Sequence, residues 1–476
     1  MLWTLLSLSL VHSSVSETLG TTTSFFPKAN HSDGSMEVTS RDCGVGRWEC
    51  YRGDCGNVIL SEDHVLYNDG DFCQVQHLYT LHVPTSAPFV IRSNIGADVG
   101  EDISGLSQKW RNLTEVEVRT RSDTGRANSS PLTSSLPNLR IPVNCPRSHR
   151  LLRWDPDGDL VRCRFMSISQ FDCEDCSEVA LLPDRNWFPS VRCNCCALKL
   201  HPKGCEGGVF RSECSVLHTP GLLPPGGVLM VTYIMEDFPQ TSINLSLSTT
   251  ETRTRRESLS KVPVQFFITV DPPVPDCVSG RYLPEFVPPT PEHEAVVFAA
   301  VLQPFIVTIV FIANFSLSPE LVHNGPVNMT VVRTATQEFS LVWTPAKDHG
   351  NQQQPVCYVV EVTSLVGRHQ SEQRCFVVIV VNAPQFLSVT PANNSVLSVS
   401  LGHTLTVPVH VETPSSPYGL VFQGPANMTL NSTLGGDHFL LRWTPSAVDV
   451  RKNVTLVFFA VFHNFVQRYL HLSQKG

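Results

Sequence analysis

A seven-residue stretch that occurs twice constrains the fold of this chain more than any other feature. It reads Phe-Ser-Leu-Val-Trp-Thr-Pro at residues 339–345 and Phe-Leu-Leu-Arg-Trp-Thr-Pro at 439–445. A second pair, Gly-Pro-Val-Asn-Met-Thr at 325–330 and Gly-Pro-Ala-Asn-Met-Thr at 424–429, lies upstream at nearly the same separation. Two matches that keep their distance indicate a duplicated domain. A period near 100 residues is too long for a solenoid repeat and suits consecutive β-sandwich domains.

The composition agrees with several domains built from strands. A chain of 476 residues corresponds to about three or four domains. Apolar residues make up 42% and can fill cores, whereas charged residues make up only 16% and there are 35 prolines. This balance favours strands and turns over long surface helices. The net charge is −8 without a long basic run, which argues against a nucleic-acid partner.

Three features of the sequence predict secretion. Residues 1–10 form an apolar run and Ser14-Val-Ser16 offers small side chains for cleavage, so we expect a signal peptide at 1–16. The 16 cysteines are even in number and clustered, as in disulfide-bonded extracellular proteins. The acceptor pattern of N-glycosylation recurs along the chain, at Asn30, Asn112, Asn128, Asn244, Asn314, Asn328, Asn393, Asn427, Asn431 and Asn453. We therefore expect a secreted, extracellular glycoprotein.

Residues 295–315 carry no charge and are long enough to span a bilayer. Gln303-Pro304 interrupts the run, and its Val, Ile and Phe residues suit strands. We therefore predict two buried strands here and no transmembrane span. The C-terminus carries no anchor signal, so we expect a soluble secreted product.

Runs of strand-like residues between turn signals divide the chain into modules. The sequence predicts a flexible Ser/Thr-rich lead-in at 17–38 and a cysteine-containing β-rich module at 39–137. A second module at 138–271 carries a cysteine-rich insertion at 173–214. Two β-sandwiches follow, at 276–383 and 384–476.

The last module is predicted to lack its closing strand. The third module has a strand-like run at 375–381, and a shift of 100 residues places its counterpart beyond Gly476. Either the chain is a fragment or variant of a longer protein, or the module ends in an open sheet edge. An open edge can pair with a strand of another chain, so edge-strand pairing through this module is one expected mode of partner binding.

The cysteines favour disulfides over metal. Cys357 and Cys375 flank a hairpin of adjacent apolar strands, which predicts a bridge between them. The pairing of the first module's four cysteines stays open, namely Cys43, Cys50, Cys55 and Cys73. The insertion has spacings close to those of a zinc ribbon, but an oxidising compartment favours a disulfide cluster of Cys173, Cys176, Cys193, Cys195, Cys196, Cys205 and Cys214.

One acidic turn is a candidate metal site. Asp155, Asp157 and Asp159 alternate along a Pro- and Gly-containing turn, as oxygen ligands do in calcium loops. The bidentate glutamate expected downstream is missing, although Glu236 and Asp237 could approach in space. A polar β-turn explains the same residues without a metal. No other cofactor is expected.

Other candidate sites have competing explanations. Arg253, Arg255 and Arg256 fit the basic pattern that secretory-pathway proteases cut, although a solvated loop is the favoured explanation. Trp343 and Trp443 lie in strand-like runs and are expected in cores rather than in a ligand site. No nucleophile elbow, phosphate loop or pair of catalytic carboxylates is present, so we do not expect an enzyme.

Four further motifs lie in order along the middle of the chain. They are Arg-Ser-Asp-Thr-Gly-Arg-Ala-Asn-Ser-Ser-Pro at 121–131, Asp-Pro-Asp-Gly-Asp-Leu-Val-Arg-Cys-Arg at 155–164, Glu-Asp-Phe at 236–238 and Ser-Glu-Gln-Arg-Cys at 371–375. They resemble the motifs of a large, poorly characterised family of secreted or cell-surface multidomain proteins of invertebrates and fishes. The resemblance covers roughly residues 110–382. It implies an all-β ectodomain of tandem immunoglobulin- or cadherin-like modules with adhesion-type roles.

These features predict an adhesion protein, or one that recognises matrix or the cell surface, with an extracellular protein or glycan as its ligand. The alternative is a soluble ligand-binding or decoy module that acts through the cysteine-rich insertion. Calcium-dependent adhesion is a third hypothesis.

Overall fold

A computed structural model represents the chain, and it describes the following parts of it: residues 21–27, 35–42, 48–68, 73–83, 87–95, 110–166, 179–182, 214–218, 220, 225–246, 250–315, 317–365, 367–381, 385–386, 389–391, 395–412, 419–431, 438–449, 455–462 and 465–473. The chain divides into two compact units. The first contains residues up to 295 together with 307–341 and 355–377, and the second contains the remainder. No described helix is long and apolar enough to cross a membrane.

The first unit is built on a twelve-stranded sheet around strand β17 (Lys261–Asp271). Nearly every side chain of β17 is buried, as its apolar sequence predicts for a strand covered on both faces. One edge of β17 pairs with β14 (Val228–Phe238). β7, β1 and β9 pair with successive stretches of β17, β9 in parallel. The remaining strands of this sheet have the bounds β1 Thr21–Pro27, β2 Ser35–Asp42, β3 Trp48–Arg52, β4 Asn57–Asn68, β5 Cys73–His82, β6 Phe89–Ile95, β7 Trp110–Val116, β9 Asn138–Pro142, β11 Leu160–Phe165 and β12 Val179–Leu182.

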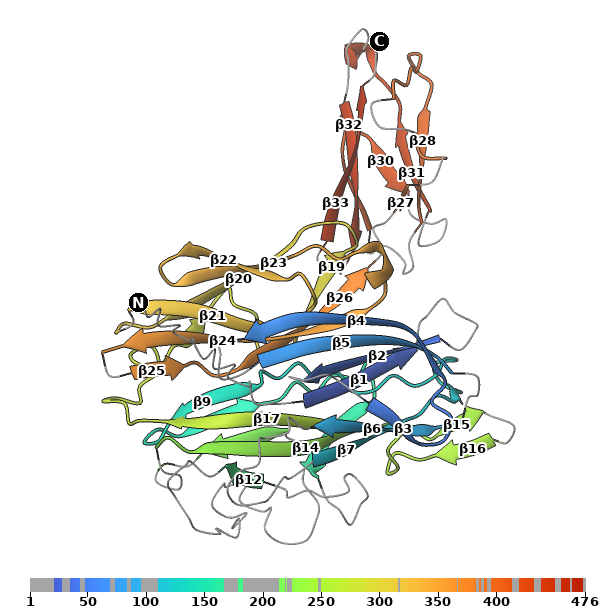
Figure 1. Ribbon diagram of the computed structural model, residues 1–476. Coiled ribbons are helices and arrows are strands. Elements are labelled where there is room, and N and C mark those ends of the chain that lie inside the picture. The colour runs from blue at the N-terminus through green and yellow to red at the C-terminus, as the bar shows by residue number, and fades with distance from the viewer. Residues whose placement is uncertain are drawn as a thin grey trace, which may run out of the picture. The chain divides into compact units, whose positions relative to one another are not determined.

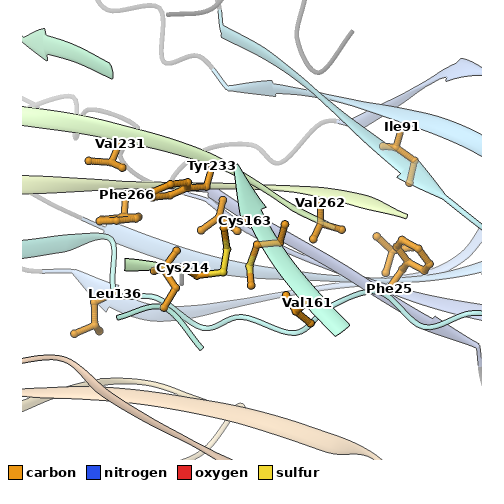
Figure 2. Packing of buried hydrophobic residues seen from close by; sticks show 14 of the residues in the cluster. Phe25, Ile91, Leu136, Val161, Cys163, Cys214, Val231, Tyr233, Val262 and Phe266 are labelled. Carbon is orange, nitrogen blue, oxygen red and sulfur yellow. A yellow bond between two sulfur atoms is a disulfide. The ribbon is translucent and has the colours of Figure 1, made fainter. Parts of the chain in front are cut away.

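A single hydrophobic core joins what the sequence divides into two modules. Phe25 and Val38 from the start of the chain share this core with Val161, Tyr233 and Phe266. Figure 2 shows several of these side chains around the disulfide that joins Cys163 to Cys214. The predicted border near residue 137 is therefore wrong, because β1, β7 and β17 belong to one sheet.

The predicted flexible lead-in at 17–38 is wrong where the structure describes it. β1 pairs with β2 over six residues, and β2 pairs in turn with β5. Phe25 and Met36 are buried. The Ser/Thr-rich composition hid strands whose consecutive residues are buried, since Thr22 and Thr23 on β1 and Glu37 on β2 are buried as well.

Two small sheets and three disulfides complete this part, as far as the structure describes it. The sheets contain β10 (Arg147–Arg150) with β13 (Ser215–His218), and β8, β15 and β16, whose bounds are Thr120–Arg121, Ile243–Ser246 and Thr250–Arg253. Disulfides join Cys50 to Cys55, Cys145 to Cys277 and Cys163 to Cys214. Cys214 was predicted to belong to the cysteine-rich cluster; the structure pairs it with a core strand instead. The other six cysteines of that cluster, and Cys43, lie outside the described residues.

The third module has the strand order of an immunoglobulin-type sandwich. One sheet has the order β18-β20-β23-β22, and the other has the order β19-β26-β24-β21 with β25 added to β24. Lettered A to G along the chain, these are the ABED and GFC sheets, with β19 as a second segment of the first strand. The bounds are β18 Glu285–Val287, β19 Ala295–Ala300, β20 Phe305–Ile312, β21 Ser318–Asn324, β22 Thr330–Ala335, β23 Glu338–Trp343, β24 Gln353–Ser364, β25 Gly367–Gln370 and β26 Arg374–Val381.

The structure bears on three predictions for this module. The uncharged run at 295–315 forms the two strands β19 and β20 as predicted, but they are only partly buried: most of β19 is half-buried, and Ile306 and Ile312 on β20 are exposed. Cys357 on β24 and Cys375 on β26 form a disulfide, and both are fully buried. Trp343 is 2% exposed, so it is a core residue as expected.

The fourth module repeats this strand order, with sheets β27-β28-β31-β30 and β29-β32-β33. The prediction that its closing strand is missing is wrong. β33 (Phe465–Ser473) pairs with β32 (Thr455–Phe462) along its whole length, through a β-bulge. The offset of exactly 100 residues failed because the connection from β32 to β33 is shorter than the equivalent connection from β24 to β26. The other strands are β27 Gln385–Phe386, β28 Leu405–Glu412, β29 Gly419–Gln423, β30 Thr429–Asn431 and β31 His438–Trp443.

The duplicated motifs build the same local structures in both copies. Asn328 and Asn427 both have φ of 65°, in turns where the next residue's N–H bonds to the proline carbonyl. A Cβ on Gly325 would lie 3.1 Å from the sulfur of Met329, and the equivalent distance at Gly424 is 2.9 Å. The glycine is therefore needed for the methionine to pack. Each copy also has a short 3₁₀ turn after its tryptophan strand, at Lys347–His349 and Ala447–Asp449.

Candidate functional site

The motifs at 121–131 and 155–164 lie together in a buried polar cluster of the first unit. We call Arg121, Asn128, Asp155, Asp157, Asp159 and Asp237, with Asp123 at the rim, the acidic cluster. Arg121 ends the short strand β8, and Asp237 is the penultimate residue of β14. The loop 155–159 leads directly into β11, and the β11–β14 register places Val161 opposite Asp237. The pairing of these two strands therefore brings the loop and Asp237 together.

Arg121 is fully buried and organises one side of the acidic cluster. Its guanidinium donates hydrogen bonds to both carboxylate oxygens of Asp159 and to both of Asp123. It also donates to Asn128 Oδ1 and lies 3.7 Å from Asp157 Oδ2. Burial alone would lower the pKa of Arg121, but the hydrogen bonds from this group to Asp159 and Asp123 outweigh it and raise that pKa.

Asp237 lies on the other side and is fully buried. Its Oδ1 accepts hydrogen bonds from the backbone N–H and the hydroxyl of Ser260, both at 2.7 Å. Its Oδ2 accepts a hydrogen bond of 2.6 Å from the side-chain amide of Asn128. Burial raises the pKa of Asp237 to about 7 although these bonds act in the opposite direction. Asn128, from the motif at 121–131, therefore connects Arg121 to Asp237 through hydrogen bonds.

The loop 155–159 is shaped by Asp155. Asp155 Oδ1 accepts the backbone N–H groups of Asp157 and Asp159, at 2.9 and 3.2 Å. Gly158 has φ of 83°, a conformation that other residues rarely adopt. The other oxygen, Asp155 Oδ2, is buried and has no hydrogen-bond partner. Burial, together with the charges of Asp237 and Asp159, raises the pKa of Asp155 well above its ordinary value.

The predicted calcium ligands are only partly brought together. One carboxylate oxygen each from Asp155, Asp159 and Asp237 lie within 4.8 Å of one another. Asp157 is not part of this group, because its Oδ2 accepts the backbone N–H of Ser129 at 2.6 Å. Burial raises the pKa of Asp157. Of Glu236 and Asp237, the two acidic residues that the sequence offers as further ligands, Asp237 approaches the loop 155–159.

Glu236 does not join the cluster. Its neighbour Asp237 points to the opposite face of β14, as consecutive strand residues do. Glu236 forms an ion pair with Arg164 on β11, with an Nε–Oε2 distance of 3.1 Å. It is therefore excluded as a ligand of the group formed by Asp155, Asp159 and Asp237.

A second candidate site is strand β4, the last strand of the large sheet's order β3-β6-β7-β17-β1-β2-β5-β4 (Figure 1). β4 pairs with β5 along one edge. Its residues 57–63 are exposed on both faces, which is unusual for a long strand. Four apolar side chains on it are between 46% and 71% exposed, namely Val58, Ile59, Leu60 and Val65.

Beside the far half of β4 lies a hollow of about 350 Å³. Asp63, His64 and Val65 line it from β4, and residues 323 and 325–329 line it from the third module. The exposed acceptor Asn328 belongs to this lining. A glycan on Asn328 would therefore stand beside β4.

The structure divides the predicted glycosylation sites into buried and exposed asparagines. Asn112 and Asn128 are 1% and 0% exposed, so the prediction is wrong for these two, because a glycan cannot be accommodated on a buried side chain. Four acceptors are exposed, namely Asn244, Asn314, Asn328 and Asn427, while Asn431 is half-buried. Asn30, Asn393 and Asn453 lie outside the described residues.

The predicted cleavage sequence lies at the surface. Arg253 ends β16 and forms an ion pair with Glu251. The turn that follows is exposed over Thr254, Arg255 and Arg256. It is closed by Glu257, whose carboxylate accepts the N–H and the hydroxyl of Thr254 at 2.9 Å each. Both the processing site and the plain solvated loop remain predictions.

No protein-family model matches the chain, and no curated protein matches it. Solved structures similar to it include an endo-fucoidan hydrolase of glycoside hydrolase family 107, at 10% identity and TM-score 0.19, covering 71% of this chain and 42% of the hydrolase. The titin I-band fragment I67–I69 is 8% identical at TM-score 0.20, with 73% and 97% covered. The insect immune protein hemolin is 10% identical at TM-score 0.19, with 93% and 95% covered. Because these TM-scores are low, the fold assignment rests on the strand order alone.

Proposed function

We propose that the chain is a secreted, glycosylated, non-enzymatic extracellular protein that acts in adhesion, or in recognition of matrix or the cell surface. The described disulfides support an oxidising compartment, because thiols inside cells are kept reduced. Cys145, Cys163 and Cys357 are all buried in their bridges, so the bridges form during folding. Exposed acceptor asparagines on both compact units are consistent with the same compartment.

The observation that carries the recognition part is strand β4. An exposed strand at the end of a sheet offers unpaired backbone groups, and natural proteins usually protect such edges with charge or a bulge. β4 has irregularities of register between Val58 and Leu60 and between Val65 and Tyr67, yet its first half exposes Val58, Ile59 and Leu60. Partner proteins can add a strand to such an edge and place apolar side chains beside these three. We therefore assign the recognition surface to β4 and its ligand to an extracellular protein.

The test uses fluorescent beads coated with the purified, secreted chain. We expect the beads to adhere to cultured cells or to the matrix that the cells deposit. The double variant Ile59→Lys/Leu60→Lys should abolish adhesion while the free energy of unfolding changes by less than about 0.5 kcal/mol per site. A matched control, Leu317→Lys/Leu365→Lys, changes two side chains that are 68% and 93% exposed elsewhere and should adhere normally.

A deletion separates this proposal from the decoy hypothesis. Removing residues 183–213 takes out most of the cysteine-rich insertion but keeps Cys214, which the bridge to Cys163 requires. Adhesion that survives the deletion and is lost in the β4 variant supports the proposal. Loss of binding in the deletion alone would assign recognition to the insertion.

A further inference from the structure

We propose that Asp155, Asp159 and Asp237 bind one calcium ion in the buried centre of the acidic cluster. This site goes beyond the adhesive function and stands independently of it. It also differs from the loop site that the sequence suggests, because Asp237 from β14 takes the place of Asp157. The ion would link the loop 155–159 to the end of β14.

The charges of the acidic cluster do not balance without a cation. Five carboxylates surround one guanidinium, that of Arg121, which is the only cation in contact with them in the described part of the chain. Arg121 contacts Asp123 and Asp159 and lies near Asp157, whereas Asp155 and Asp237 have no cationic partner there. A buried carboxylate without a partner is costly, so such groups are paired, protonated or bound to metal.

One ligand position is unsatisfied. Asp155 is 6% exposed, and its Oδ1 is used by two backbone N–H groups of its own loop. Its Oδ2 is buried without a hydrogen-bond partner, and one oxygen of the same carboxylate lies within 4.8 Å of oxygens of Asp159 and Asp237. Buried polar atoms in native proteins almost always have partners. The Asp155 carboxylate therefore has one oxygen that is free to bind a metal ion, and it lies close to two further carboxylates.

The geometry and the ligand chemistry favour calcium. Calcium binds oxygen at about 2.3–2.6 Å, so ligands on opposite sides of the ion lie about 5 Å apart. The three carboxylate oxygens lie within 4.8 Å of one another, which fits around one ion. All three ligands are hard oxygens, whereas zinc prefers nitrogen and sulfur. Magnesium demands a near-ideal octahedron at about 2.0–2.1 Å, whereas calcium accepts the irregular geometry of ligands that come from separate segments of the chain.

The experiment measures thermal unfolding of the full chain, first freed of metal with a chelator and then supplied with about 5 mM calcium, above the range of about 0.1–1 mM typical of extracellular calcium modules. We expect the Tm to rise by about 5 °C. Native mass spectrometry should show one added calcium ion per chain. The same Tm with and without calcium would overturn the proposal, since protons alone would then balance the charge.

Three variants locate the ion. Asp155→Asn and Asp237→Asn should lose the calcium-dependent rise in Tm, whereas Asp157→Asn, a change in the same loop, should keep it. Asp155→Asn should also be at least as stable as the natural chain in chelator, because it removes an uncompensated charge and no hydrogen bond to Oδ2. A response lost in Asp157→Asn but kept in Asp237→Asn would contradict the assignment and place any ion in the loop alone.

Discussion

Glu361 on β24 is a buried acid whose titration should be visible in the stability of the protein. It is 5% exposed, and its carboxylate pairs with Arg368 and accepts a hydrogen bond from Gln370. Burial raises the pKa of Glu361, which outweighs the opposing effects of Arg368, Gln370 and Arg140, and the nearby charge of Glu320 adds to the rise. The folded state therefore holds this proton more tightly than the unfolded state.

The sign of the pH dependence follows from this. The free energy of unfolding should fall as the pH rises from the ordinary carboxyl range through the raised pKa of Glu361. Glu361→Gln removes the titration, so the difference in stability between variant and natural chain should grow in the variant's favour over that range. Urea unfolding between about pH 4 and pH 8 measures it. The exposed Glu285 gives a control, Glu285→Gln; an equal trend in both variants would contradict the prediction.

Trp343 and Trp443 are equivalent core residues of the duplicated sandwiches, 2% and 3% exposed. Replacing either by alanine leaves a large cavity and should cost about 3–5 kcal/mol of unfolding free energy. Chemical denaturation followed by circular dichroism measures the loss. Val448→Ala, at a side chain that is 69% exposed, serves as the control and should have little effect. A loss of less than about 1 kcal/mol at either tryptophan would mean that the duplicated stretch does not anchor the core.

At the scale of single residues, the sequence predicts those features that depend only on neighbouring residues. The tryptophans, the bridge between Cys357 and Cys375 and the turn at 155–159 are all recognisable from nearby residues, and the structure contains them. Asp237 could only be considered as a candidate, because its position depends on the register of β11 with β14. Asn112 and Asn128 fit a three-residue acceptor pattern, but that pattern contains no information about burial.

The hairpin strands β24 and β26 are held together by the Cys357–Cys375 bridge, which closes a loop with a sequence separation of 18. Replacing both cysteines by alanine should cost about 3 kcal/mol, because the unfolded chain regains the freedom that the bridge removed. The bridge between Cys50 and Cys55 closes a separation of 5, so the same double replacement there should cost roughly 1 kcal/mol less. Denaturant unfolding of both variants compares them. Equal costs would contradict the loop-length argument.

At the scale of elements, local composition predicts where strands form, but it does not predict which distant strands pair. The strands of the third module and the apolar run at 295–315 follow from local composition. The place of β1 beside β17 does not, because Thr21 pairs with Gln265, far away in the sequence, and only the folded sheet brings them together. For the same reason, one twelve-stranded sheet and one main core run across the predicted border near residue 137. β33 was missed because loop lengths differ between the duplicated sandwiches.

At the scale of the whole molecule, the secreted protein should carry glycans only where acceptors reach solvent. Glycopeptide mapping after enzymatic deglycosylation in water labelled with oxygen-18 should find modification among the exposed acceptors Asn244, Asn314, Asn328 and Asn427. Asn112 and Asn128 should be unmodified in the same sample, which makes them internal controls. A glycan on Asn128 would contradict the acidic cluster itself, because this side chain bonds to Arg121 and Asp237.

The bridge between Cys145 and Cys277 spans 132 residues and encloses the exposed turn that ends at Arg256. A protease that cuts after Arg256 would therefore open a ring rather than release a fragment. The nicked protein would gain the mass of one water and migrate as a single band until a reductant is added, when two bands separate. Proteolytic maturation of this molecule, where it occurs, would create new chain ends in a loop without releasing any part of the protein.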